Sequence, residues 1–139
     1  MRFAVLGSGS QGNGTLIVSA DTCVLVDCGF SLRETERRLL RLGVDPAQLS
    51  AILVTHEHAD HVHGVGLLSR RYNLPVYLSQ GTLRGMRKPV EVAGFVRGGE
   101  SLQIGALRID VIAVAHDAQE PTQLSLIHIS EPTRLLSIS

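Results

Sequence analysis

The chain has few cysteines, few aromatic residues, no tryptophan and no excess charge of either sign. Two cysteines, Cys23 and Cys28, are too few for a disulfide framework, and their C-x4-C spacing lacks the second pair of a zinc knuckle. We therefore expect reduced, buried thiols. Thirteen basic and 13 acidic residues cancel, so the bulk charge indicates neither nucleic acid nor an anionic membrane as a partner. Local basic patches remain compatible with it, at Arg70 and Arg71 or at Arg84, Arg87 and Lys88.

A long apolar run is also lacking. The first ten residues, MRFAVLGSGS, contain one arginine and only four consecutive apolar residues, which is too short for a signal-peptide core. No other stretch is long enough to span a membrane, so the expected location is the cytoplasm. A length of 139 residues, with 44% hydrophobic and 19% charged residues, is typical of one globular domain at most.

The hydrophobic pattern predicts strands that alternate with helices and then a hairpin, which indicates a layered α/β domain. A helix is expected over Ser31–Leu42, because Ser31 and Glu34 form a capping-box pattern and Gly43 follows as a terminator. Further helices are expected over 62–72 and 82–87, with a short turn at 45–46. Strands are expected over 2–6, 15–19, 23–27, 51–55, 74–78, 102–104 and 107–114.

Gly7, Gly9 and Gly12 imitate a dinucleotide-binding fingerprint, with Asp27 20 residues after the first glycine. That fingerprint requires the glycine turn to open a helix, whose N-terminus holds the pyrophosphate. Here the segment after the turn, Gly14–Ser19, has the pattern of a strand. We therefore interpret the glycines as a tight turn between strands. Three polar residues of that turn are candidates to face a pocket: Ser8, Ser10 and Asn13.

The segment THEHADHVHG follows the buried strand at 51–55 and concentrates metal-binding side chains. In an extended segment His56 and His58 project to the same side and can hold one ion, whereas Asp60 and His61 point elsewhere and can begin a second site. Imidazole and carboxylate suit Zn²⁺, with Fe and Mn as alternatives. The H-E-x-x-H zinc motif is excluded, because its second histidine would fall on Asp60. A solvated, histidine-rich loop is the alternative without chemistry.

THEHADH resembles the H-x-H-x-D-H signature of the metallo-β-lactamase-fold hydrolases. VLVDCG at 24–29 resembles the strand-end aspartate motif that precedes this signature, and AVAHDAQEP at 113–121 resembles the third-histidine segment of the YycJ/WalJ-like branch. MRFAVLGSGSQGN resembles the N-terminus of that branch, and the likeness covers Met1 to about Gln123. It implies the first half of an αββα sandwich, incomplete in this chain.

The resemblance also implies two divalent metal ions. His56, His58 and His116 would bind the first ion, and Asp60 and His61 the second. Asp27 would orient a ligand histidine by a hydrogen bond, although a turn-forming aspartate is the alternative. A water between two metal ions loses a proton readily, with a pKa near roughly 7, and the hydroxide then attacks a carbonyl or phosphoryl centre. Asp60 would act as the catalytic residue that orients the hydroxide.

Two features of the family domain have no counterpart after His116. A bridging aspartate and a last histidine are both missing, so the second metal site is expected to be incomplete. LSLIHISEPTRLLSIS resembles translated sequencing-library adapter, and we interpret residues 124–139 as a non-native tail, with a divergent natural tail as the alternative. Residues 1–123 would then be the N-terminal part of the domain. We further expect apolar side chains that the other half should cover to be exposed: Leu107, Ile109 and Val111.

Three functions are compatible with these patterns. The resemblance favours a metal-dependent hydrolase that cleaves phosphodiesters of DNA or RNA, at least in the intact protein. A hydrolase of small esters or thioesters is the alternative within the same fold. A non-catalytic, metal-binding fragment is the third, and it would hold one metal ion per chain where a dinuclear hydrolase holds two.

Overall fold

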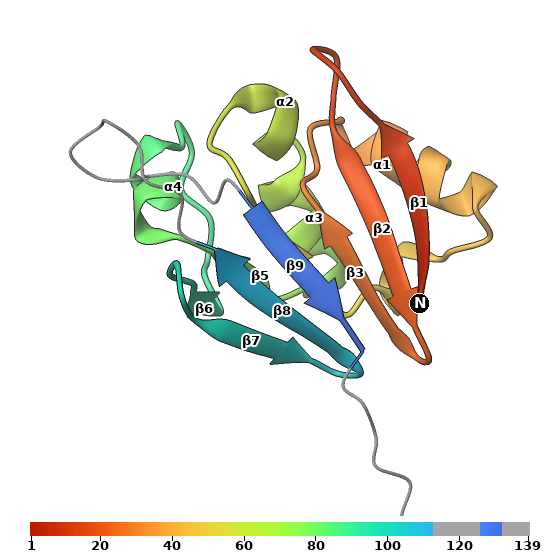
Figure 1. Ribbon diagram of the computed structural model, residues 1–139. Coiled ribbons are helices and arrows are strands. Elements are labelled where there is room, and N and C mark those ends of the chain that lie inside the picture. Colours follow the sequence, from red (N-terminus) through yellow and green to blue (C-terminus); the bar gives the residue numbers. More distant parts are fainter. Residues whose placement is uncertain (113–125, 132–139) are drawn as a thin grey trace, which may run out of the picture.

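The computed structural model describes residues 1–112 and 126–131, which form two sheets and a layer of helices (Figure 1). The first sheet has six strands in the order β1 to β6: β1 (Arg2–Gly7), β2 (Gly14–Ser19), β3 (Thr22–Val26), β4 (Ala51–Leu53), β5 (Val76–Leu78) and β6 (Gly94–Phe95). Strands β1 to β3 are antiparallel neighbours, and β3 to β6 are parallel. The second sheet is antiparallel and contains β7 (Ser101–Ile104), β8 (Leu107–Ile112) and β9 (Leu126–Ser130).

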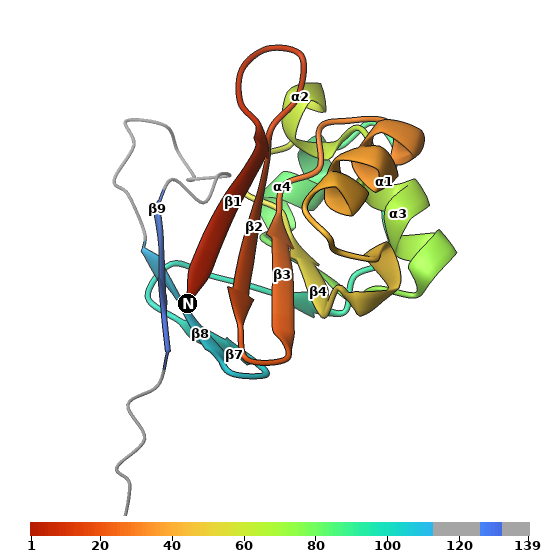
Figure 2. The same cartoon turned by 90° about the vertical axis from the view of Figure 1, so that its right-hand side faces the viewer.

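The helices cover one face of the six-stranded sheet and the second sheet covers the other (Figure 2). They are α1 (Leu32–Arg41), α2 (Ala59–Val62), α3 (Val65–Tyr72) and α4 (Gln80–Gly85), with a short 3-10 turn, η1, at Pro46–Gln48. This order of layers agrees with the predicted fold class. Among the described residues no helix is long and apolar enough to cross a membrane.

Alternation along the central strands explains the two cores. On β4, Ile52 faces the helices and packs with Leu39 of α1, while Leu53 faces the second sheet and packs with Ile109 of β8. All four side chains are fully buried. Burial of each side chain stabilises the folded state by roughly 1.5–3 kcal/mol relative to an exposed position. Because β4 is buried on both faces, its sequence is a continuous apolar run without polar alternation.

The expectation that Leu107, Ile109 and Val111 are exposed was wrong. Their exposed fractions are 0%, 0% and 3%. Two of them, Leu107 and Ile109, pack against Val24 and Leu53 of the first sheet. Alternation in β8 marks one apolar face correctly, but the pattern does not say which part of the chain covers that face.

The helices begin and end largely where local signals placed them. The Ser31 hydroxyl accepts the backbone N–H of Glu34 at 3.2 Å, which is one half of the predicted capping box; the Glu34 carboxylate instead binds Arg38 at 3.0 Å. Gly43 ends α1 with a φ of +75°, as a terminating glycine does. The predicted helix over 62–72 matches α3 from Val65 onward, but its first residue, Val62, is instead the last residue of α2, and Gly64 lies between the two helices.

Gly64 separates these helices because the chain passes very close to it. A Cβ at this position would lie 2.1 Å from the Phe30 carbonyl oxygen. Two short elements lacked a sequence signal: β6 has only two residues, and β9 lies in the segment that we expected to be non-native. Pairing of 126–130 with β8 does not decide the origin of that segment, since any alternating apolar strand can complete an open sheet edge.

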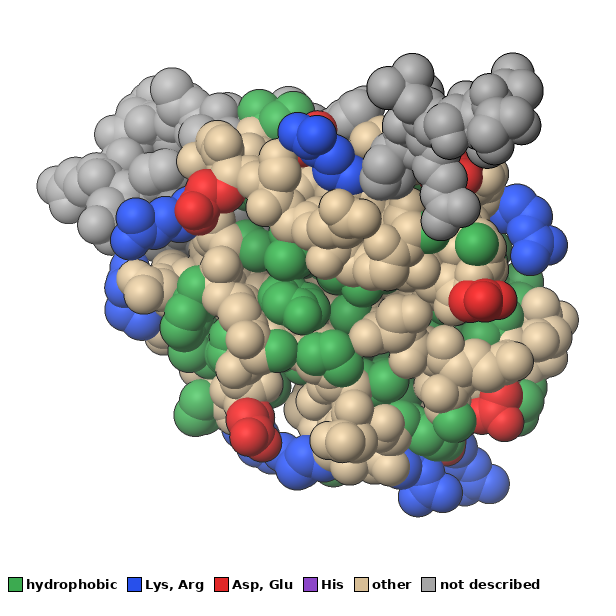
Figure 3. Space-filling model, turned by 90° about the horizontal axis from the view of Figure 1, so that it is seen from below, with side chains coloured by type: hydrophobic (Ala, Val, Ile, Leu, Met, Phe, Trp, Pro, Cys, Tyr) green, Lys and Arg blue, Asp and Glu red, His purple; other side chains and the backbone are tan. Residues whose placement is uncertain are grey.

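The two ends of the molecule differ. Viewed from below, at the end opposite α2, hydrophobic side chains occupy the middle of the surface and no histidine of the described residues is visible (Figure 3). The histidine-rich segment lies at the other end, where the parallel strands β3 and β4 finish (Figure 1). In open α/β sheets the carboxyl ends of parallel strands are the usual place for a site.

Candidate metal centre

Asp27 and Thr55 come together because β3 and β4 are parallel and end at the same edge of the sheet. The last paired residues are Val26 and Leu53, and the Asp27 N–H extends this ladder by donating to the Leu53 carbonyl at 2.8 Å. Asp27 has a φ of +64°, a left-handed conformation that aspartate adopts more readily than most residues. The chain therefore turns sharply after β3.

The Asp27 carboxylate is buried, with 6% of the residue exposed, and it accepts three hydrogen bonds. Oδ1 accepts the backbone N–H of Thr55 at 2.7 Å. Oδ2 accepts the Thr55 hydroxyl at 2.5 Å and binds Nδ1 of His61 at 2.7 Å. These donors compensate the cost of removing a charged group from water.

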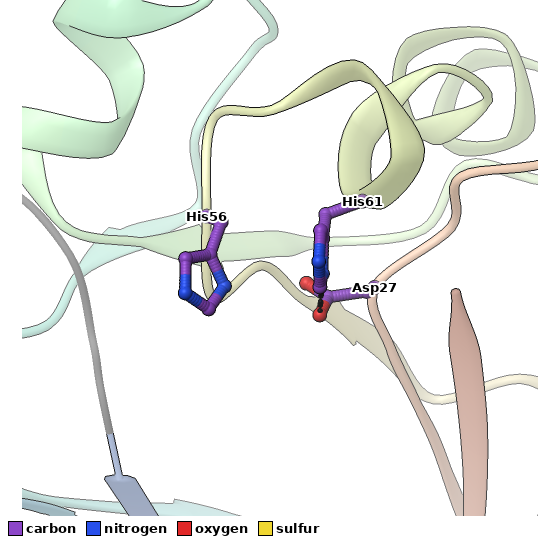
Figure 4. A group of neighbouring side chains, drawn as sticks. All are labelled: Asp27, His56 and His61. Atoms are coloured by element: carbon purple, nitrogen blue, oxygen red, sulfur yellow. Dashed lines mark hydrogen bonds and ion pairs between the residues drawn. The ribbon is translucent and has the colours of Figure 1, made fainter. Parts of the chain in front are cut away.

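His61 of α2 points toward Asp27 (Figure 4). A carboxylate can only accept, so Nδ1 of His61 carries the proton in this contact. In the neutral ring Nε2 then has the lone pair. The arrangement is the one in which a carboxylate fixes the tautomer of a metal-binding histidine.

His56 has the same tautomer as His61, because Thr55 links its ring to Asp27. The Thr55 hydroxyl lies 2.8 Å from Nδ1 of His56, and it donates its own proton to Asp27. Its oxygen must therefore accept the Nδ1 proton of His56, which again leaves the lone pair on Nε2. One carboxylate thus determines the tautomers of two histidines, directly for His61 and through a hydroxyl for His56.

Ligand atoms of Asp27, His56 and His61 lie within 4.8 Å of one another. The two imidazole rings are 4.7 Å apart between centroids and tilted by 43°. Two neutral imidazoles with their Nε2 lone pairs available are donors that fit Zn²⁺ and similar divalent ions. Both oxygens of Asp27 already accept hydrogen bonds, so Asp27 fits an orienting role better than that of a ligand.

The other predicted ligands among the described residues, Asp60 and His58, are not part of this group of three. Oδ2 of Asp60 lies 3.8 Å from Nε2 of His61, near the roughly 3.4 Å expected for two ligands about 2.1 Å from one tetrahedral ion. His58 is exposed at the N-cap of α2, its ring centroid 6.2 Å from that of His56, and it is outside the group of three. His116 lies outside the described residues.

Two further residues of the motif, Glu57 and His63, are predicted to take no part as ligands, and the structure gives their positions. The Glu57 side chain turns toward α4, where its Cγ lies 2.6 Å from the position of a Cβ on Gly85. His63 is an exposed residue at the end of α2, outside the group of three. Thr55 and its link to His56 were not predicted, because a threonine before a histidine has no distinctive local pattern.

The Gly7–Gly12 turn leads into strand β2 and not into a helix, which confirms that the dinucleotide fingerprint is accidental. The family model described as the metallo-beta-lactamase superfamily matches residues 7–134. The chain belongs to the metallo-beta-lactamase superfamily. The predicted family and the predicted fold class are thereby confirmed, and membership of this superfamily implies binding of a divalent metal.

Relatives within the superfamily include nucleases. The chain is 36% identical over 126 residues to the exodeoxyribonuclease YycJ of Bacillus anthracis. The aligned region covers 87% of this chain and 48% of that relative. The chain is 34% identical over 128 residues to the exodeoxyribonuclease WalJ of Streptococcus pneumoniae, and the aligned region covers 86% and 47%. Among solved structures, the MIM-2 metallo-beta-lactamase superimposes with a TM-score of 0.65 at 26% identity, covering 74% of this chain and 46% of that one. The chain spans about half the length of the curated relatives it matches.

Proposed function

We propose that this superfamily member, in its full natural length, hydrolyses phosphodiester bonds of DNA or RNA with the help of two divalent metal ions. His56, His58 and His116 would hold the first ion, and Asp60 and His61 the second, with Zn²⁺ the first candidate and Mn or Fe the alternatives. The observation that carries the proposal is the contact that Nδ1 of both His56 and His61 makes with the Asp27–Thr55 pair. Both rings have Nδ1 bound within the protein and Nε2 left for a metal.

Each residue of the site then has a defined task. When bound, the metal ions supply a water of lowered pKa and withdraw charge from the attacked oxygen. Asp27 and Thr55 keep His56 and His61 in the orientation and tautomer that a metal requires. The Asp60 carboxylate, beside His61, orients the attacking water.

Phosphodiester substrates are supported by two further observations. The relatives YycJ and WalJ are named exodeoxyribonucleases. In addition, α4 packs on the metal-site loop where Gly85 meets Glu57, and exposed basic residues follow at Arg87 and Lys88. Exposed cations that follow closely in the chain on a residue packed against the metal-site segment are compatible with a polyanionic substrate. The zero net charge of the whole chain adds nothing to this point.

A substrate panel tests the proposal. Single-stranded and double-stranded DNA, RNA, and small ester, thioester and lactone substrates are incubated with purified full-length protein in Zn²⁺, Mn²⁺ or EDTA. We expect metal-dependent release of nucleotides, abolished by EDTA and by His58→Ala. Cleavage of esters with no action on nucleic acids would favour the alternative hydrolase. Equal inactivity of wild type and His58→Ala on every substrate, with a single metal ion bound per chain, would favour a non-catalytic metal-binding module.

A further inference from the structure

The glycine-rich turn between β1 and β2 has no role in the proposed chemistry so far, yet it lies beside the metal-site segment (Figure 2). Only a residue without a Cβ fits at Gly12, because the Phe30 side chain occupies the space beside it. A Cβ on Gly12 would lie 2.5 Å from Cε1 of Phe30. The turn is thus pressed against the segment that follows Asp27. This close packing brings the next residue, Asn13, to the metal-site segment.

Asn13 is first of all fixed within its own turn. Its side-chain Oδ1 accepts the N–H of Gly9 at 3.1 Å, and its Nδ2 donates to the Gly9 carbonyl at 2.9 Å. Gly9 has a φ of +119°, which favours glycine. A side-chain amide accepts through its oxygen and donates through its nitrogen, so it can make both contacts at once. The Asn13 side chain is therefore held in one orientation before it meets any other part of the protein.

The same amide reaches Asp60, 47 residues away in the chain. Nδ2 of Asn13 lies 3.1 Å from the Asp60 carbonyl oxygen and 3.1 Å from the carboxylate oxygen Oδ2. The backbone N–H of Asn13 also donates to the Asp60 carbonyl at 2.7 Å. Asn13 thus contacts Asp60 through both its main chain and its side chain.

Gly29 closes this contact from the other side. Its N–H donates to the Asn13 carbonyl at 2.9 Å, and a Cβ on Gly29 would lie only 1.8 Å from the Asp60 carbonyl oxygen. Asp60 is therefore held where the glycine-rich turn and the segment after β3 meet. The oxygen that Asn13 binds, Oδ2, is also the one 3.8 Å from Nε2 of His61.

We propose that Asn13 is a positioning residue that holds the Asp60 carboxylate toward the second metal ion, and that this is the task of the glycine-rich turn. The inference rests on the proposed role of Asp60 as a ligand of that ion. An amide at position 13 donates to the carboxylate without adding charge, so it fixes the direction of Oδ2 while leaving the oxygen a ligand. Alanine would retain only the main-chain contacts.

The test uses the full-length protein, Co²⁺ as the probe, and the variants Asn13→Ala and Gln11→Ala. Gln11 is exposed in the same turn and serves as the matched control. For Asn13→Ala we expect the second equivalent of Co²⁺ to bind about 10-fold to 100-fold more weakly, with a changed visible spectrum. The first equivalent should bind as in wild type. On a DNA substrate kcat should fall while KM changes little, since Asn13 does not contact substrate.

A double-mutant cycle separates positioning from general loss of structure. In an Asp60→Asn background, Asn13→Ala should cause no further loss of the second Co²⁺ ion, whereas a purely structural effect would be additive. Should Asn13→Ala not fold, Asn13→Ser replaces it, because serine retains turn-forming character and is too short to reach Oδ2.

Two outcomes contradict the inference in different ways. A folded Asn13→Ala protein with wild-type affinity and spectrum for the second Co²⁺ ion overturns the positioning role alone. Wild-type protein that binds no second Co²⁺ ion overturns the proposed dinuclear function, and the inference with it.

Discussion

Asp27 holds Thr55 at two points, accepting its backbone N–H on Oδ1 at 2.7 Å and its hydroxyl on Oδ2 at 2.5 Å. The two residues follow the ends of neighbouring parallel strands and are 28 positions apart in the chain. The contact carries the effect of one buried charge to His56, which the carboxylate binds only through the threonine hydroxyl. Its consequences can be tested one side chain at a time.

Thr55→Val removes the hydroxyl at nearly constant shape. His56 then loses the acceptor for its Nδ1 proton, and the ring is free to change tautomer. We expect metal affinity to fall by about 10-fold, as when other partners of metal-binding histidines are lost, and unfolding free energy to fall by roughly 1–3 kcal/mol. Zn²⁺ competition titration and thermal melting measure the two effects. Thr55→Ser retains the hydroxyl and should behave as wild type; equal losses in both variants would disprove the role of the hydroxyl.

Asp27→Asn tests the carboxylate with little change in backbone preference, because asparagine also tolerates a positive φ. An amide cannot accept all three donors that now bind Asp27. We expect a loss of roughly 1–3 kcal/mol in stability and at least about 10-fold in metal affinity. Asp21→Asn, at an exposed turn between β2 and β3, is the control. Wild-type metal affinity in Asp27→Asn would show that the histidines keep their tautomers without it.

Gly29→Ala and Gly66→Ala should have opposite effects on stability. A Cβ on Gly29 meets the Asp60 carbonyl oxygen at 1.8 Å, so the backbone must shift; we expect a loss of roughly 1–3 kcal/mol and weaker metal binding. Gly66 lies in α3, and the nearest atom to its Cβ is 3.5 Å away. Alanine there should stabilise the helix by roughly 0.5–1 kcal/mol. Urea unfolding compares the two, and a neutral Gly29→Ala would contradict the packing of the site.

Because the Cys28 thiol is buried, we expect the free energy of unfolding to fall in alkali. Burial raises the pKa of its thiol from 9.0 to about 11. The unfolded chain therefore releases this proton first, and stability falls as pH rises from about 9 toward 11. Below pH 9 both states are protonated and no effect is expected. Urea unfolding at pH 8 and pH 10.5 measures the change, which should be smaller in Cys28→Ala; an identical pH dependence in the variant would assign it to other groups.

The sequence predicted those parts of the fold that depend on neighbouring residues. Helix α1 was placed within one residue at each end because its cap, Ser31, and its terminator, Gly43, are local. The candidate metal-site segment could be predicted because several side chains able to bind metal are crowded into THEHADH. The predictions that were wrong depend on residues distant in the chain. The helix break at Gly64 is imposed by Phe30, 34 positions earlier, and Ile109 is buried by the facing sheet.

The links within the site were predictable only in part. An orienting role for Asp27 followed from the family resemblance, and the hydrogen bond to His61 agrees with it. The relay through Thr55 and the contact of Asn13 with Asp60 join residues up to 47 positions apart, and neither has a periodic or compositional signal. Such contacts depend on how three loops meet at one edge of a sheet.

The central claim is that the side chains around His56 and His61 bind metal, and Zn²⁺ titration against a chromophoric chelator tests it most directly. We predict tight Zn²⁺ binding by the wild-type protein, and at least about 100-fold weaker binding by a folded His56→Ala/His61→Ala variant. His63→Ala, which alters an exposed histidine outside the group, should bind as wild type. Equal Zn²⁺ affinity in wild type and the double variant would contradict the account.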